Sequence, residues 1–82
     1  MRQIEKPPTE KQLGVLQHIR AFRLAHGYSP SFREIADHFG WASTMAPATH
    51  IEGLERRGLL SRVYGVARTT QLTEKGEALC SP

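Results

Sequence analysis

Apolar side chains in the first third of the chain recur at the three- and four-residue spacing of a helix that buries one face. The positions that share this buried arc are Val15, Leu16, Ile19 and Phe22, and Leu13 flanks it. Thr9 and Gln12 form a capping box before the pattern, and Gly27 follows it as a helix-terminating glycine. The pattern therefore predicts a helix over residues 10–25.

A second capping box, Ser31 with Glu34, precedes a shorter apolar pattern. This arrangement predicts a helix over residues 32–38 that buries Ile35, Ala36 and Phe39. Gly40 follows it and allows the chain to turn sharply, because glycine tolerates backbone angles that other residues avoid.

A third helix is predicted to begin near Ser43 or Thr44 and to run to Arg57, with Gly58 after it. Pro47 determines this start, since proline is tolerated in a helix only where the backbone amides are unpaired, within the first turn. The predicted buried stripe of this helix consists of Pro47, Ala48, Ile51 and Leu54.

After the third helix the pattern changes to a period of two, which predicts strands over residues 59–63 and 69–72 around a glycine-containing turn. Thr73 then caps a last short helix over residues 74–80. The chain is therefore mainly α with a small β-hairpin. Its predicted fold is a winged helix-turn-helix with a three-helix core, a two-stranded wing and a short C-terminal helix.

With 82 residues, the chain has room for one compact domain. Residues 1–8 end in two prolines and are predicted to be a flexible N-terminal arm, and residues 9–82 form the winged domain. Because Cys80 is the only cysteine, an internal disulfide and a cysteine-based metal cluster are excluded.

Candidate chemistry of other kinds receives little support from the sequence. The histidines, which lie on separate predicted elements without metal-ligand spacing, are His18, His26, His38 and His50. No nucleophile motif or phosphate-binding glycine loop is present, so we expect no enzyme activity, no metal and no small-molecule cofactor. The sequence also has no membrane-spanning run, so no membrane partner is expected.

The net charge of +3 becomes informative when its distribution is considered. The 18 residues from Arg56 to Thr73 contain four arginines and no acid, so the other 64 residues carry a net charge of −1 (7 basic against 8 acidic). This concentration favours a polyanionic partner. The side chains predicted to contact DNA phosphates or a groove are Ser31, Arg33, Arg56, Arg57, Arg62 and Arg68, with Arg68 free to reach a minor groove.

If Ile51 and Leu54 point inward, the opposite face of the third helix is open. That face consists of Met45, Ala46, Thr49, Glu52, Gly53 and Arg56. Its small side chains allow close approach to base edges, with methyl contacts to thymine and hydrogen bonds from hydroxyls. The residues predicted to read bases are Ser43, Thr44, Met45, Ala46 and Thr49.

Four segments resemble the DNA-binding domain of LexA repressors, and the resemblance as a whole covers about residues 9–72. These segments are Gly27–Ala36, Phe39–Trp41, His50–Leu60 and Gly65–Arg68. The resemblance implies a winged helix-turn-helix that binds operator DNA as a transcriptional repressor, with its third helix in the major groove. Ser43, Ala46 and Arg68 match the family pattern.

Two departures accompany the resemblance. The family carries polar and acidic base-contacting residues where this chain has Met45, Pro47, Ala48 and Thr49. The family also continues into an autoproteolytic dimerisation domain that these 82 residues do not contain. The run Leu72–Gly76 instead resembles the ending of MarR-type winged helices, so we expect the chain to complete its own fold.

Two classes of partner remain open from the sequence. The arginine cluster favours double-stranded operator DNA, bound by two copies because one small module offers a modest interface. The apolar run Met45–Ala48 favours the alternative, a protein-interaction module acting as an accessory factor of transcription or replication. The expected location is the cytoplasm of a bacterium, or of a phage-infected one, in association with the nucleoid.

Overall fold

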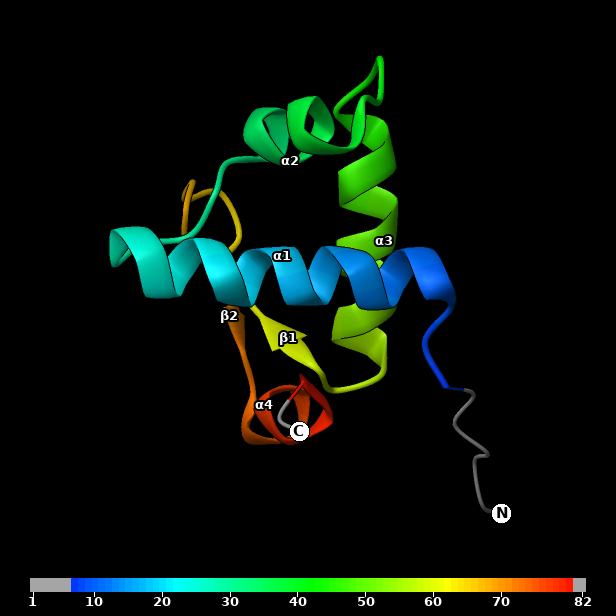
Figure 1. Cartoon of the computed structure of the whole chain (residues 1–82), viewed down its shortest axis with the longest axis vertical. Helices are drawn as coiled ribbons and strands as arrows, with labels where there is room; N and C mark the ends of the chain where they lie inside the picture. The colour runs from blue at the N-terminus through cyan, green and yellow to red at the C-terminus, as the bar shows by residue number, and fades with distance from the viewer. Residues whose placement is uncertain (1–6, 81–82) are drawn as a thin grey trace.

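The computed structural model describes residues 7–80, in which three helices, a two-stranded antiparallel sheet and a fourth helix follow one another in the order that the sequence predicts. The elements are α1 (Glu10–His26), α2 (Phe32–Phe39), α3 (Met45–Arg56), β1 (Leu60–Ser61), β2 (Gln71–Leu72) and α4 (Glu74–Cys80). Helix α1 crosses in front of the sheet, with α2 at one end of the molecule and α4 at the other (Figure 1). This is the architecture of a winged helix-turn-helix. Most of the predicted N-terminal arm, residues 1–6, lies outside the described residues.

The predicted capping boxes start the first two helices. In α1, Thr9 Oγ1 accepts the Gln12 amide at 3.1 Å, and Gln12 Oε1 accepts the Thr9 amide at 3.0 Å. Ser31 and Glu34 repeat this exchange at the start of α2. Gly27 and Gly40 end the two helices with φ angles of 82° and 73°, in the left-handed region that favours glycine. These local signals explain why the predicted helix boundaries are accurate to within one residue.

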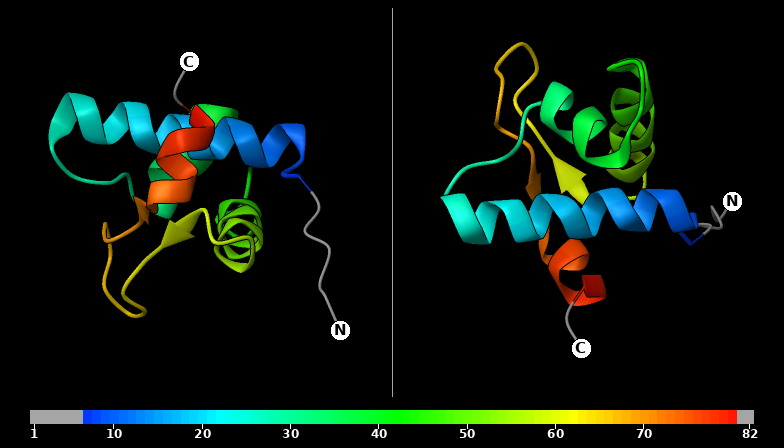
Figure 2. Two further views of the ribbon diagram at one scale, coloured as in Figure 1. Left: turned by 90° about the horizontal axis from the view of Figure 1, so that it is seen from below. Right: turned by 45° about the horizontal axis from the view of Figure 1, so that its top comes forward.

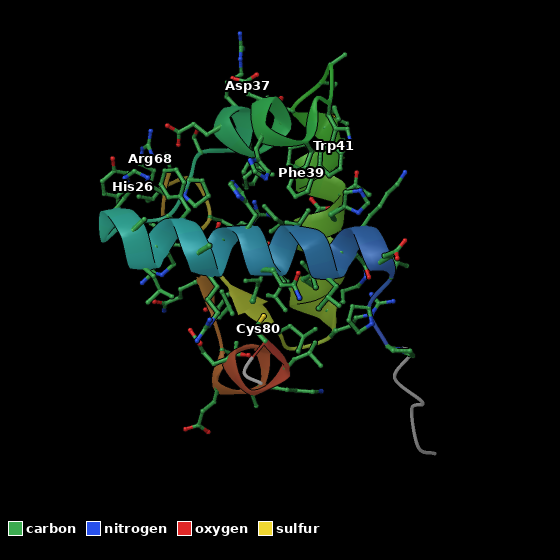
Figure 3. All side chains as sticks on the ribbon, viewed as in Figure 1. His26, Asp37, Phe39, Trp41, Arg68 and Cys80 are labelled. Atoms are coloured by element: carbon green, nitrogen blue, oxygen red, sulfur yellow. The ribbon has the colours of Figure 1, made fainter. Side chains whose placement is uncertain are left out.

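The core lies where α1 crosses α3 and the first strand. Its buried hydrophobic side chains are Val15, Leu16, Ile19, Ile35, Ala36, Ile51, Leu54, Leu59 and Leu60. Pro47 is also fully buried, in the first turn of α3 where its missing N–H removes no helix hydrogen bond. Phe39 and Trp41 stack with ring centroids 4.8 Å apart and fill the angle between α2 and α3 (Figure 3).

The hairpin is shorter than predicted. Only two residue pairs are in register, Leu60 with Leu72 and Ser61 with Gln71, so the predicted strands over 59–63 and 69–72 are too long. Beyond them, the hydroxyl of Thr69 accepts the Val63 amide at 3.0 Å and donates to the carbonyls of that residue and Val66. A side chain therefore replaces the backbone ladder. We call residues 62–70, which join the two strands, the wing.

Candidate nucleic-acid interface

The first half of α3 lies at an open end of the molecule, together with α2 and the wing (Figure 2). Met45 opens the helix and is 72% exposed. The Ser43 hydroxyl accepts the Met45 amide at 2.9 Å, whereas Thr44, the residue that precedes the helix, makes no side-chain cap hydrogen bond. Thr49 donates its hydroxyl to the Met45 carbonyl at 2.9 Å, which leaves its oxygen lone pairs available to a donor.

The structure thus brings the predicted base-reading residues together on one surface. Four of them are exposed and Ala46 is half-buried. A neighbouring hollow lies between α2 and the start of α3 and is lined by Arg33, Ala36, Asp37, Trp41, Ala42, Ser43 and Thr44. Asp37 points away from the body of the molecule at this end (Figure 3). The hollow combines a guanidinium, hydroxyls and the start of a helix, groups that bind phosphate oxygens.

One residue of the predicted open face is buried. Gly53 was predicted beside Glu52 and Arg56, which are indeed exposed. A Cβ atom at Gly53 would lie only 2.4 Å from Nε2 of Gln12, so α1 covers this position. Helix α1 crosses α3 so closely that it covers more of the α3 surface than the positions of Ile51 and Leu54 predict.

The predicted phosphate-contacting arginines fall into two groups. Arg33 on α2 and Arg56 on α3 are exposed, and neither forms an ion pair with any of residues 7–80. Arg57 is half-buried and donates to the Gly53 carbonyl at 3.0 Å. Ser31 is half-buried as the N-cap of α2. The other group, Arg62 and Arg68, is held by carboxylates.

The sequence predicts that Arg68 is free to reach a minor groove, but its guanidinium is bound to Glu34. Its Nη1 and Nη2 lie 2.8 and 3.1 Å from the two carboxylate oxygens of Glu34, and Nη1 also donates to the Ser29 carbonyl at 3.2 Å. The guanidinium further lies 5.1 Å from the centre of the Tyr28 ring. Contact of Arg68 with DNA stays a prediction, which now requires that this pair either opens or reaches the groove intact.

Arg62 is enclosed in a similar way. Its Nε lies 2.9 Å from a carboxylate oxygen of Glu55 on α3, and the two side chains are only 14% and 17% exposed. The guanidinium also lies 4.4 Å from the centre of the Tyr64 ring and 5.4 Å from that of Phe32. Acids from α3 and α2 therefore balance the two wing arginines, Arg62 and Arg68, which are two of the four that make up the local charge of +4.

Sequence reasoning missed these acidic partners. It assigned Glu34 to a capping box, which is correct, and did not single out Glu55. The buried Ser29 hydroxyl, which bonds the Thr70 carbonyl and accepts Arg23 Nη1 at 2.9 Å, was missed as well. No signal in the sequence could have indicated these pairs, because their members lie on different segments, 6 to 41 positions apart, that only the fold brings into contact.

The part of the chain that the structure describes contains neither a cluster of metal-binding side chains nor a helix that could span a membrane. Within residues 7–80, no three histidine, cysteine, aspartate or glutamate side chains converge to hold a metal ion. Among those residues, no helix combines the length and the apolar character needed to cross a membrane.

Comparison with known proteins shows which family this chain resembles over most of its length. A family model described as the LexA DNA binding domain matches residues 5–69. The LexA repressor of Verrucomicrobium spinosum is 39% identical over 66 residues, which cover 80% of this chain and 33% of that protein. The LexA repressor of Koribacter versatilis is 41% identical over 84% of this chain, and LexA repressor 2 of Geobacter sulfurreducens is 43% identical over 79% of it, covering 33% and 32% of those proteins. The chain therefore spans about a third of the length of these curated relatives.

Proposed function

The chain belongs to the LexA DNA-binding domain family, and from this premise we propose that it binds double-stranded DNA in a sequence-specific way as a transcriptional repressor. The observation that carries the proposal is the exposed first half of α3, where hydroxyls and small or apolar side chains share one surface. The similar proteins are named LexA repressors, which supports repression, rather than activation, as the proposed effect on transcription. We further propose that it acts in the cytoplasm, associated with the nucleoid, and by binding rather than catalysis.

In this proposal the first half of α3 reads base edges in the major groove. Met45 and Ala46 offer methyl groups to thymine, a contact that small apolar side chains make there. The hydroxyls of Ser43, Thr44 and Thr49 supply hydrogen bonds to base edges. A thymine-containing half-site is therefore favoured over a purely G·C one.

Phosphate contacts come from the cationic groups that surround this surface. Arg33, which lines the hollow, and Arg56 on α3 are exposed and form no ion pair with any of residues 7–80. Half-buried Arg57, which also donates to the Gly53 carbonyl, adds a further cation at the end of α3. The start of α2 at Ser31 contributes the positive end of a helix dipole. Because a single module makes a modest interface, we propose that two copies occupy one operator.

Selection from a random duplex pool tests this proposal directly. The pool is selected at about 50 and 200 mM salt, and the enriched duplex is then titrated by fluorescence anisotropy. Three phosphate-neutralising arginines per copy predict a slope of about −2.7 for log K against log salt, and an affinity loss of roughly 40-fold across this range. A palindromic or directly repeated motif would establish two copies.

A pair of charge variants sharpens this test. Arg33→Ala is expected to reduce the slope by about 0.9. Arg20→Ala removes the same charge near α4, where Arg20 pairs with Glu77 at 2.8 Å, and is expected to leave the slope unchanged. No enrichment at either salt concentration would overturn the DNA proposal and favour the protein-interaction module, for which the exposed Met45 is the supporting observation.

A further inference from the structure

Ion pairs connect both ends of the wing to the helices of the core, although the wing is an exposed loop. Arg62, in the leg that follows β1, pairs with Glu55 of α3. Arg68, in the leg that precedes β2, pairs with Glu34 of α2. Each pair joins the wing to one of the two helices that form the helix-turn-helix.

The second pair has the geometry of a specific interaction. Arg68 is the one non-glycine residue among 7–80 with a positive φ angle, 63°, a conformation that costs free energy unless the surroundings support it. The support comes from the two-point contact with Glu34 and the bond to the Ser29 carbonyl. We call this set of contacts, with the Tyr28 ring beneath the guanidinium, the wing latch.

Glu34 serves two elements at once. One carboxylate oxygen accepts the Ser31 amide at 2.9 Å and so caps α2, and the same oxygen lies 2.8 Å from Arg68. The hydrogen bond from Arg68 and the bond from the Ser31 amide hold the pKa of Glu34 at about 2, so the carboxylate is ionised at neutral pH. The start of α2 and the wing therefore share one charged anchor.

We propose that Glu34 is a positioning residue for DNA binding: through Arg68, it fixes the wing beside α2 and α3 so that the wing and α3 approach DNA as one rigid surface. This inference rests on the proposed function. A two-point contact between a guanidinium and a carboxylate restrains orientation as well as distance. A wing held in this way pays less conformational entropy when it docks.

A competing interpretation of the Glu34–Arg68 pair predicts the opposite change in DNA affinity when Glu34 is neutralised. If Glu34 merely masks Arg68, the guanidinium leaves it to enter a groove when DNA binds. Neutralising Glu34 would then release a cation and remove a negative charge, so it would tighten binding and steepen the salt dependence. If Glu34 positions the wing, the same substitution weakens binding and leaves the salt dependence unchanged. The direction of the change separates the two.

Glu34→Gln is the variant that isolates the latch. A glutamine at position 34 can still accept the Ser31 amide, because Gln12 accepts the Thr9 amide in the equivalent capping box of α1. Helix α2 therefore keeps its cap. We expect this variant to bind the enriched duplex about fivefold more weakly, with an unchanged salt slope. Anisotropy titrations at several salt concentrations measure both quantities, and thermal unfolding verifies that the variant is folded.

Arg68→Lys keeps the inference testable if Glu34→Gln does not fold. Lysine retains the charge but cannot make the two-point contact, so the latch predicts about fivefold weaker binding, whereas a simple phosphate contact predicts affinity near that of the wild type. Glu74→Gln is the matched control for Glu34→Gln, because it makes the same substitution in the first turn of another helix, α4. This control is expected to leave the affinity unchanged.

The outcomes distinguish the inference from its premise. Absence of wild-type binding to any duplex would overturn the proposed function and the latch together. Wild-type binding with equal or tighter binding by folded Glu34→Gln, or with unchanged binding by Arg68→Lys, would overturn the latch and leave the proposed function standing.

Discussion

Two glycines inside helices have opposite surroundings in this domain. Gly76 of α4 is buried against the sheet, and a Cβ atom there would lie 2.2 Å from the Leu59 carbonyl oxygen. Gly14 of α1 is different, since its Cβ atom would make an ordinary contact with the Phe39 ring at 3.6 Å. Helix α4 therefore packs against Leu59 and β2 this closely only because residue 76 has no side chain.

This contrast gives a prediction at the residue scale. Gly76→Ala is expected to reduce the free energy of unfolding by about 1–3 kcal/mol, because a backbone carbonyl must move to admit the methyl group. Gly14→Ala is expected to increase it by about 0.5–1 kcal/mol, the normal gain when alanine replaces glycine in a helix. Urea denaturation measures both, and effects of the same sign would contradict this account of α4 packing.

At the scale of the elements, the helices begin with different caps. The Ser31 hydroxyl accepts the Glu34 amide at 3.1 Å in a part-buried capping box. The start of α3 has only the exposed bond from the Met45 amide to the Ser43 hydroxyl, at 2.9 Å. The first cap stabilises the domain, whereas the second leaves the Ser43 side chain accessible at the surface that we propose reads bases.

Substitution of the two serines tests this difference. Ser31→Ala is expected to cost about 1 kcal/mol of unfolding free energy, the usual effect of losing an N-cap. Ser43→Ala is expected to cost less than about 0.5 kcal/mol, as exposed substitutions do, and to weaken binding to the enriched duplex instead. Chemical denaturation and anisotropy measure the two effects. A larger stability loss in Ser43→Ala would contradict the assignment of roles.

The helices were predictable from the sequence because their signals are local. The capping hydrogen bonds of Thr9, Ser31 and Gly27 join residues at most four positions apart, so both partners of each bond lie within one short stretch of sequence. The strands were predicted too long because the hydroxyl of Thr69 replaces their outer backbone hydrogen bonds, a contact across the hairpin that period-two alternation does not reveal.

On the scale of the whole molecule, a row of rings crosses α1, α2 and α3. His18 of α1 stacks on His38 of α2 with ring centroids 3.9 Å apart, and Phe39 stacks on Trp41, which is 5.1 Å from His50 of α3. Burial and the nearby charge of His38 lower the pKa of His18 from its usual value of 6.5. The sequence placed these histidines on separate elements, and the fold brings two of them together.

The lowered pKa predicts acid sensitivity. Below about pH 6.5 the unfolded chain protonates His18 more readily than the folded one, so stability falls as the pH drops through this value toward the lower pKa of the folded state. His18→Gln is expected to reduce the fall in Tm between about pH 7.5 and 5.5. Phe22→Leu is the control, since it disturbs the neighbouring ring without removing a titrating group and should lower Tm equally at both pH values. An undiminished fall in His18→Gln would contradict this origin.

The sequence by itself determined where the helices begin and end, which faces they bury, and the resemblance to the LexA DNA-binding domain, because each of these depends on residues close together along the chain. It also indicated which face of α3 is open, apart from the covered Gly53, and the residues proposed to read bases lie together at the start of that helix. Only the tertiary structure decided the state of the arginines. Arg62 and Arg68 meet acids from α3 and α2, and Arg33 and Arg56 remain exposed, because an ion pair depends on which elements the fold brings into contact.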